Sequence, residues 1–198
     1  MCKAGQASMA YFYFDFRDIN KQHWRDLVAS LLIQLSSQWS RWLNILLRLY
    51  SAHGNGAQQP NDDALKHCLI DILKYQHPDR RPDHPIYLIM DALDECRDTS
   101  EVPSPRNRIL RLLKELADLH LPNVRICVTS RPEFDIRDFL EPLTSRQVSL
   151  HDQSGQKQDI SDYVRSVVYS DSEPYMRRWK KEDKELVIDT LSTRADGM

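Results

Sequence analysis

The sequence predicts an α/β fold in which helices flank a parallel sheet, and two patterns carry this prediction. Short, almost wholly apolar segments end in polar residues, which is typical of strands buried on both faces. Longer segments between them place apolar residues every three or four positions, which is typical of amphipathic helices. Because helices separate the strands along the chain, the strands are predicted to run parallel.

The first strand is predicted in Ala7–Phe16, a run of apolar and aromatic residues that is too short for a typical helix. A helix follows from His23. Its apolar residues are Trp24, Leu27, Val28, Leu31, Leu32 and Leu35. A second helix is predicted from Arg41 to Tyr50, before the turn sequence HGNG. The third helix begins after Asn61, which can cap its acidic first turn.

A loop is predicted in 76–85, which holds three prolines. The next strand is Ile86–Met90, a run of five apolar residues that ends at an aspartate. A helix then begins after Ser104, because serine is a favoured N-cap and Pro105 suits the first helical position. The third strand is Val124–Val128.

The rest of the chain is predicted to hold a short fourth strand at Gln147–Leu150 and two helices, Lys157–Tyr169 and Lys180–Arg194. We expect residues 1–153 to form the α/β core. Residues 154–198 are expected to form a separate helical segment.

Composition narrows the class of protein. The 27 lysines and arginines and the 29 aspartates and glutamates give a net charge of −2, which provides no general attraction for nucleic acid. The four cysteines lie far apart, which is typical of reduced intracellular thiols. We find no signal peptide and no apolar run long enough to cross a membrane. A soluble cytoplasmic protein is therefore expected.

Glycine is scarce, with five residues where an average chain of this length has about 14. Phosphate-binding loops need glycine where the backbone approaches the ligand. Neither G-x-x-x-x-G-K-[ST] nor G-x-G-x-x-G occurs in the 198 residues. A complete phosphate loop is therefore excluded from this sequence.

Three carboxylates, Asp91, Asp94 and Glu95, follow the second strand within five positions. Ligands of parallel sheets bind outside the carboxyl ends of the strands. A hard cation such as magnesium would relieve the mutual repulsion of these charges, with Asp91 as its ligand. Asp94 or Glu95 could then orient or deprotonate an attacking water. The alternative interpretation is an acidic helix cap or a solvated loop.

Arg131 follows the third strand in the sequence TSRPE, so it is expected at the same edge of the sheet. Its guanidinium could contact a terminal phosphate with two donors. Alternatively, it pairs with Glu133 or Asp135 as an ordinary surface arginine. Asp15 and Arg17 lie at the end of the first strand and could line the same edge of the sheet, but pairing with each other or a plain loop is favoured.

Together these motifs resemble a known family. PIYLIMDALDEC resembles the Walker B strand of NACHT-type P-loop NTPases, and VRICVTSRPE resembles their sensor strand. The order YFYFDFRD, DALDEC and TSRPE is especially similar to the nephrocystin-like N-terminal domains of fungal NOD-like ATPases of the STAND class. The resemblance implies a P-loop NTPase fold with Asp91 holding Mg²⁺ through water. It also implies that Asp94 and Glu95 act on the attacking water and that Arg131 senses the terminal phosphate of ATP or GTP.

The sequence departs from this family in one respect. Family members have a first strand and a Walker A loop before the part that matches Ala7–Asp15, and this sequence starts at Met1 without them. The family's strand order places that strand between Val124–Val128 and Gln147–Leu150. We therefore expect these two strands to leave a gap or to pair directly. We also expect exposed apolar surface where the missing helix would pack.

The leading functional hypothesis is a fragment of a nucleotide-binding signalling switch, with weak nucleotide binding and little NTPase activity. A non-catalytic interaction or scaffold module with protein partners, or one that self-associates, is the alternative. A magnesium-dependent nuclease is less favoured, because the third strand offers Arg131 where such sites use a lysine or another carboxylate.

Overall fold

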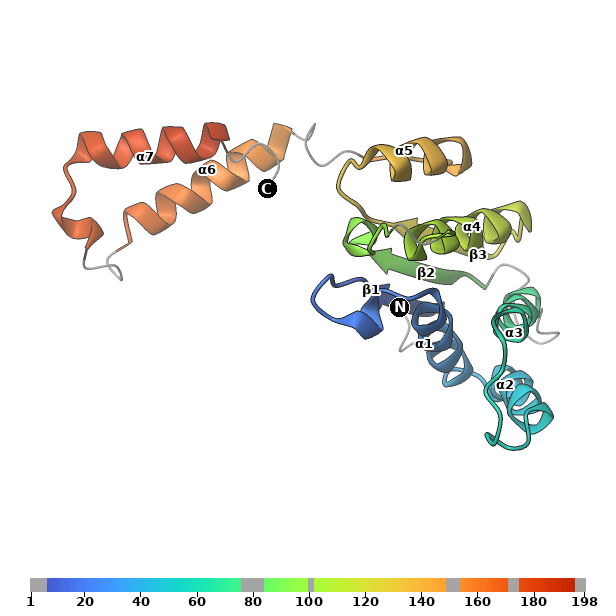
Figure 1. The fold of residues 1–198 in the computed structure, drawn as a ribbon. Coiled ribbons are helices and arrows are strands. Elements are labelled where there is room, and N and C mark those ends of the chain that lie inside the picture. Colours follow the sequence, from blue (N-terminus) through green and yellow to red (C-terminus); the bar gives the residue numbers. More distant parts are fainter. Residues whose placement is uncertain (1–6, 76–83, 100–101, 149–153, 171–174, 195–198) are drawn as a thin grey trace. The chain divides into compact units, whose positions relative to one another are not determined.

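The computed structural model describes residues 7–75, 84–99, 102–148, 154–170 and 175–194 of the chain. The chain divides into two compact units, Met1–Thr144 and Ser145–Met198 (Figure 1). The first unit holds the sheet, and the second is helical. No helix among the described residues is long and apolar enough to cross a membrane.

The sheet of the first unit has three parallel strands in the order β1-β2-β3. These strands are β1 (Ser8–Tyr13), β2 (Ile86–Asp91) and β3 (Val124–Val128). Their register pairs Tyr13 with Asp91 and Met90 with Val128, so all three strands end at one edge of the sheet. The predicted α/β class and parallel direction are confirmed for the strands that the structure describes.

Helices follow each strand of the first unit. They are α1 (Trp24–Ser36), α2 (Ser40–Ala52), α3 (Asp62–Lys74), α4 (Pro105–Asp118) and α5 (Phe134–Leu140). Three 3-10 turns, η2 (Ile19–Lys21), η3 (Leu93–Glu95) and η4 (Glu141–Leu143), complete the described part of the unit. Both predicted caps form, since Asn61 accepts a hydrogen bond from the Ala64 amide and Ser104 accepts one from the Asn107 amide.

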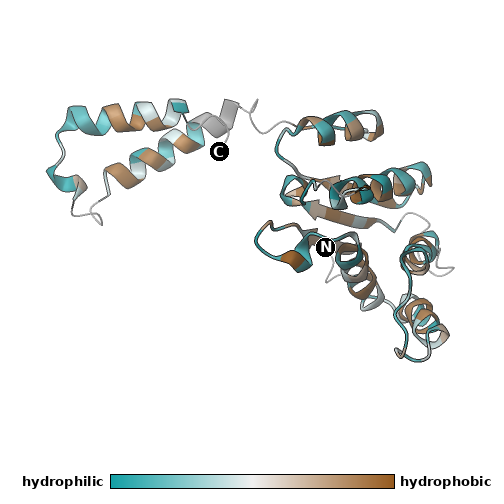
Figure 2. Ribbon diagram, viewed as in Figure 1, coloured by the Kyte–Doolittle hydropathy of each residue, from teal (hydrophilic) through white to brown (hydrophobic). Residues whose placement is uncertain are grey.

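The hydrophobic core lies between one face of the sheet and α1, α3 and α4. Figure 2 shows hydrophobic residues along β2 and on parts of the surrounding helices. Burying each large apolar side chain contributes about 1.5–3 kcal/mol to folding. Fully buried members include Leu27, Leu31, Leu69, Ile72, Leu88, Met90 and Ile109.

The opposite face of the sheet is open in the described residues, which corrects the prediction that the strands are buried on both faces. Burial alternates along β1 and β2. Tyr11, Tyr13 and Tyr87 are 43%, 53% and 39% exposed. Tyrosine tolerates this position because its ring is apolar and its hydroxyl is polar. The exposed apolar surface expected where the missing helix would pack stays a prediction.

The two edges of the sheet differ. On β1, the side-chain amide of Gln34 donates to the Tyr11 carbonyl at 2.7 Å and accepts from the Tyr11 amide at 3.1 Å. Gln38 contacts both backbone groups of Met9 in the same way, at 2.7 and 3.1 Å. Two glutamines of α1 therefore replace a neighbouring strand along β1.

The outer edge of β3 has no such replacement among the described residues. The Thr129 amide donates to Met90 of β2, so the alternate residues Ile126 and Val128 direct their backbone groups outward. The expected fourth strand at 147–150 does not form at Gln147 and Val148, and residues 149 and 150 lie outside the described part. Whether that segment approaches β3 therefore stays a prediction.

The second unit is a helical hairpin of α6 (Ser154–Val168) and α7 (Lys181–Arg194), with the 3-10 turn η5 (Met176–Arg178) before α7. Val168 and Ile188 are buried. The Arg165 guanidinium pairs with Glu185 at 3.1 Å, and Glu185 also accepts a hydrogen bond from the Tyr169 hydroxyl at 2.8 Å. The two helices predicted in this region are confirmed, with ends that differ by a few residues.

Candidate functional site

Asp94 and Glu95 lie on a tight turn directly after β2, whose last residue is Asp91. Ala92 adopts a left-handed conformation, with φ 56° and ψ 48°, directly before η3. Leu93 is fully buried and anchors the turn in the core. The turn η3 then presents Asp94 and Glu95 at the carboxyl edge of the sheet. One left-handed residue and one buried leucine therefore place these two carboxylates.

Thr129, the residue after β3, joins the two strand ends. Its hydroxyl donates a short hydrogen bond to the Asp91 carboxylate. The same hydroxyl oxygen accepts from the Ala92 amide at 3.0 Å, and the Thr129 carbonyl accepts from the Leu93 amide at 3.0 Å. Among the described residues, only one of the two carboxylate oxygens of Asp91 accepts a hydrogen bond, so the other can accept from a ligand.

Asp94 binds Arg131, the arginine that follows β3. Its carboxylate accepts a hydrogen bond from the Arg131 amide at 3.0 Å and lies 3.5 Å from the Arg131 Nε. The Asp94 side chain is only 9% exposed, whereas the Arg131 side chain is 79% exposed. Asp94 thus fixes the base of Arg131 and leaves most of the guanidinium open to solvent.

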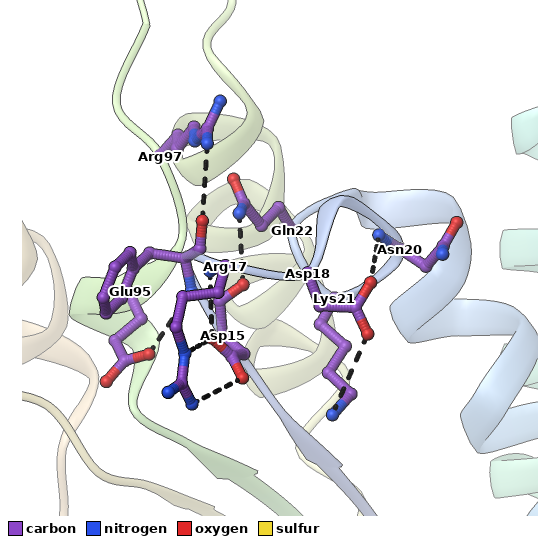
Figure 3. Close-up of polar contacts among 9 residues, drawn as sticks. Asp15, Arg17, Asp18, Asn20, Lys21, Gln22, Glu95 and Arg97 are labelled. Carbon is purple, nitrogen blue, oxygen red and sulfur yellow. Dashed lines mark hydrogen bonds and ion pairs between the residues drawn. The ribbon is translucent and has the colours of Figure 1, made fainter.

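Glu95 points the other way, toward the loop after β1 (Figure 3). Its carboxylate accepts from the Phe16 amide at 3.3 Å, and Arg97 donates to the Phe16 carbonyl at 3.3 Å. Glu95 and Arg97 therefore hold the backbone of Phe16 from both sides, through its amide and its carbonyl.

Asp15 and Arg17 form the pair predicted from the sequence, with two side-chain contacts of 3.0 and 3.1 Å (Figure 3). The Arg17 guanidinium and amide hold the pKa of Asp15 at about 2, below its ordinary value of 3.8. Gln22 donates to the Asp15 carbonyl at 3.1 Å. Since Asp15 keeps its charge at neutral pH, this loop carries a paired rather than a free carboxylate.

Arg106, in the first turn of α4, connects the acidic turn to the segment after Arg131. Its guanidinium donates to the carbonyl of Asp94 at 2.8 Å and to the carbonyl of Cys96 at 3.0 Å. A third nitrogen lies 3.1 Å from the Asp135 carboxylate at the start of α5. The Arg106 side chain is 11% exposed. One guanidinium therefore holds both segments at fixed positions.

The comparisons with known proteins give one family match. The family model described as "Nephrocystin 3, N-terminal" matches residues 1–131. The chain belongs to the nephrocystin 3 N-terminal family. No curated protein and no solved structure matches the chain. The family match contains the three described strands, the acidic turn and Arg131, and it ends before α5.

In this member of the nephrocystin 3 N-terminal family, the three carboxylates lie within five residues, at the end of β2 and on the turn after it, but have separate partners. Asp91 contacts Thr129, Asp94 contacts Arg131 and Glu95 contacts Phe16. Each carboxylate thus accepts a hydrogen bond from a different donor of the protein. No group of three or more potential metal ligands occurs in the described part of the chain.

The predicted site residues Asp91, Asp94 and Arg131 are brought to one edge of the sheet, while Glu95 faces the β1 loop. Arg131 pairs with Asp94 and not with Glu133 or Asp135, so the ordinary surface pairing considered from the sequence is wrong.

Sequence reasoning did not single out Thr129 or Arg106 for a role at the site. Thr129 stands two positions before Arg131, at the end of a predicted strand, and that position was a usable signal. Arg106 gives no local signal, because its partners in this nephrocystin 3 N-terminal family member lie 10, 12 and 29 residues away.

Proposed function

We propose that this chain carries the acidic strand and the sensor arginine of a nucleoside-triphosphate site of the NACHT type, which works as a nucleotide-dependent signalling switch. The pairing of Asp94 with Arg131 is the observation that supports this proposal most strongly. It joins the two motifs through a nearly buried carboxylate and presents an open guanidinium. Such a guanidinium can give two donors to a phosphate.

Asp91 is the residue that fits the magnesium ion of the bound nucleotide. It ends β2 at the ligand-binding edge, and one of its oxygens is oriented by Thr129. Magnesium keeps several waters and takes few carboxylates, so one oriented aspartate that acts through water suits it. Magnesium would neutralise part of the charge on the phosphates.

Glu95 and Asp94 differ in how they could act on the attacking water. Asp94 is committed to Arg131, so its part is to hold the sensor in place. Glu95 accepts one hydrogen bond of 3.3 Å from Phe16. That contact is long, and Glu95 therefore has capacity to orient a water.

Weak binding and little turnover are expected of these 198 residues. They contain no G-x-x-x-x-G-K-[ST] loop, whose backbone amides and lysine cradle the phosphates in P-loop enzymes. Such donors supply much of the transition-state stabilisation. The described residues offer Arg131 and Asp91 but no second phosphate-binding element. Either ATP or GTP fits this chemistry.

A two-dimensional NMR titration with magnesium ATP or magnesium GTP up to about 10 mM tests the proposal, because it detects millimolar binding. We expect amide shifts at 91–95 and 129–131, which disappear in Arg131→Ala. Arg125→Ala is the matched control, since Arg125 is an exposed arginine of β3 whose guanidinium contacts only local carbonyls. Absent shifts, or equal shifts in Arg131→Ala, would refute the site. Robust phosphate release would refute the low turnover.

The second candidate function is a non-catalytic interaction or scaffold module. The observation that favours it is the sheet itself, which has an open tyrosine-rich face and outward backbone groups at Ile126 and Val128. Parallel sheets are normally covered on both faces, so such a surface favours a protein partner or self-association. Light scattering at high protein concentration tests this candidate. A chain that stays monomeric without a partner would count against self-association.

A further inference from the structure

The loop after β1, residues Asp15–Gln22, is joined to the acidic segment at Phe16, where Glu95 and Arg97 approach it (Figure 3). The Phe16 amide donates to the Glu95 carboxylate, and the Phe16 carbonyl accepts from the Arg97 guanidinium, each at 3.3 Å. Both contacts are longer than most hydrogen bonds and are therefore weak. Because the Phe16 side chain is exposed, it adds little packing to hold the loop.

The two ends of this loop are fixed by other contacts. Before the loop, the Phe14 amide donates to the Asp91 carbonyl at 3.0 Å. At its end, Gln22 is buried, and its carbonyl accepts from the Cys96 thiol at 3.2 Å. A change at Phe16 can therefore move the middle of the loop while both ends stay in place.

Glu95 cannot hold this loop and serve the proposed nucleotide site at the same time. The strand order β1-β2-β3 places the loop after β1 on one side of β2 and Arg131, which follows β3, on the other side. Neighbouring strands lie about 4.8 Å apart, so the ends of β1 and β3 are about 10 Å apart. A carboxylate that accepts from Phe16 therefore points away from a phosphate held by Arg131. To orient a water toward that phosphate, Glu95 must release Phe16.

We propose that Glu95 is a two-position switch that couples the nucleotide site to the loop after β1. Without nucleotide, its carboxylate holds the Phe16 amide and stays away from the attacking water. With a nucleoside triphosphate bound, the carboxylate turns to the water and releases the amide. The middle of the loop, where Phe16 and Ile19 are 56% and 64% exposed, then changes position. This inference rests on the proposed nucleotide site and adds how that site changes the protein surface.

The contact that Glu95 gives up is weak, which makes the exchange feasible. A ligand shifts an equilibrium between two conformations only by its difference in affinity for them. The bond of 3.3 Å lies beyond the usual N–H···O range of about 2.7–3.2 Å, so a modest preference for the turned position is sufficient. Asp94 cannot make the same exchange, because its side chain is nearly buried and contacts both the amide and the guanidinium of Arg131.

Two-dimensional NMR of the full chain tests both positions through the Phe16 amide. Without nucleotide, Glu95→Ala removes the acceptor and should move the amide proton of Phe16 upfield. Glu95→Gln keeps an oxygen acceptor and should move it less. Magnesium ATP at about 10 mM should move the wild-type Phe16 amide toward its position in Glu95→Ala. In Glu95→Ala itself, the nucleotide should leave this amide in place.

Glu133→Ala is the matched control. Glu133 is an exposed glutamate two residues after Arg131, and its side chain does not cap α5. This variant should show the same Phe16 shifts as the wild type. The amides of 129–131 report nucleotide binding in every variant, so a variant that has lost binding is recognised. Dispersed spectra show that each variant is folded.

Three results would overturn the switch: a Phe16 amide that is unchanged in Glu95→Ala without nucleotide, a wild-type Phe16 amide that stays in place while 129–131 shift, or a nucleotide-induced Phe16 shift that persists in Glu95→Ala. Each of these leaves the nucleotide site intact, provided that 129–131 shift on addition of magnesium ATP. If 129–131 do not shift in the wild type, the nucleotide site itself is refuted and the switch with it.

Discussion

Replacing Arg106 with alanine should loosen the acidic turn and the segment after Arg131 together. The guanidinium donates to two backbone carbonyls, those of Asp94 and Cys96, and contacts Asp135. A hydrogen bond from a charged donor contributes about 1.5–3 kcal/mol, and the effects of neighbouring bonds do not add fully. The Asp135 side chain is 44% exposed, so its ion pair adds at most about 0.5 kcal/mol. We expect a loss of about 2–3 kcal/mol in the free energy of unfolding of the first unit.

Urea unfolding followed by tryptophan fluorescence measures this loss. Three of the four tryptophans, Trp24, Trp39 and Trp42, lie in the first unit, so the signal reports mainly on that unit. Arg111→Ala is the control, because Arg111 is an exposed arginine of the same helix. Its effect should stay within about 0.5 kcal/mol. If Arg106→Ala destabilises no more than Arg111→Ala, the guanidinium does not hold the two segments and the reasoning is wrong.

Three further predictions concern the sheet edge, a carboxylate and a thiol. Replacing both Gln34 and Gln38 with alanine should expose the β1 edge and promote association, which size-exclusion chromatography would show as larger species; an unchanged elution profile would contradict this role. The pKa of Asp15, followed by carbon-13 NMR, should lie at about 2 and rise toward 3.8 in Arg17→Ala. Because folding lowers this pKa, the ionised Asp15 carboxylate stabilises the folded state; this stabilisation is complete above about pH 4 and is lost as the pH falls through about 2. An unchanged pKa of Asp15 in Arg17→Ala would exclude the pairing. Cys127 should react rapidly with a thiol reagent, since it is exposed, whereas burial raises the pKa of the Cys68 and Cys96 thiols to about 11. A fast phase that is unchanged in Cys127→Ser would contradict this.

Local patterns predicted the elements well, because their causes are local. The caps at Asn61 and Ser104 lie within three residues of the amides that they satisfy. The strand Val124–Val128 has the predicted ends. In contrast, the seven-residue helix α5 was missed, because it is too short to show a periodic apolar pattern.

The open sheet face could not be predicted, because residue type does not reveal which helices pack on which side. Apolar and aromatic residues occupy both faces of β1, and only their partners decide burial. The same limit holds for the site. The sequence placed Asp91, Asp94 and Arg131 at one edge, but the choice of Thr129, Arg131 and Phe16 as partners depends on contacts between distant segments.

The most direct test of the proposed nucleotide site uses manganese ATP in place of magnesium ATP. The paramagnetic ion broadens the NMR signals of amides near it and so reports where the metal-nucleotide complex lies. The account predicts that broadening is strongest at 91–95 and 129–131 and that it weakens in Asp91→Asn. Uniform broadening, or broadening centred elsewhere in the chain, would contradict a nucleotide site at the carboxyl edge of the sheet.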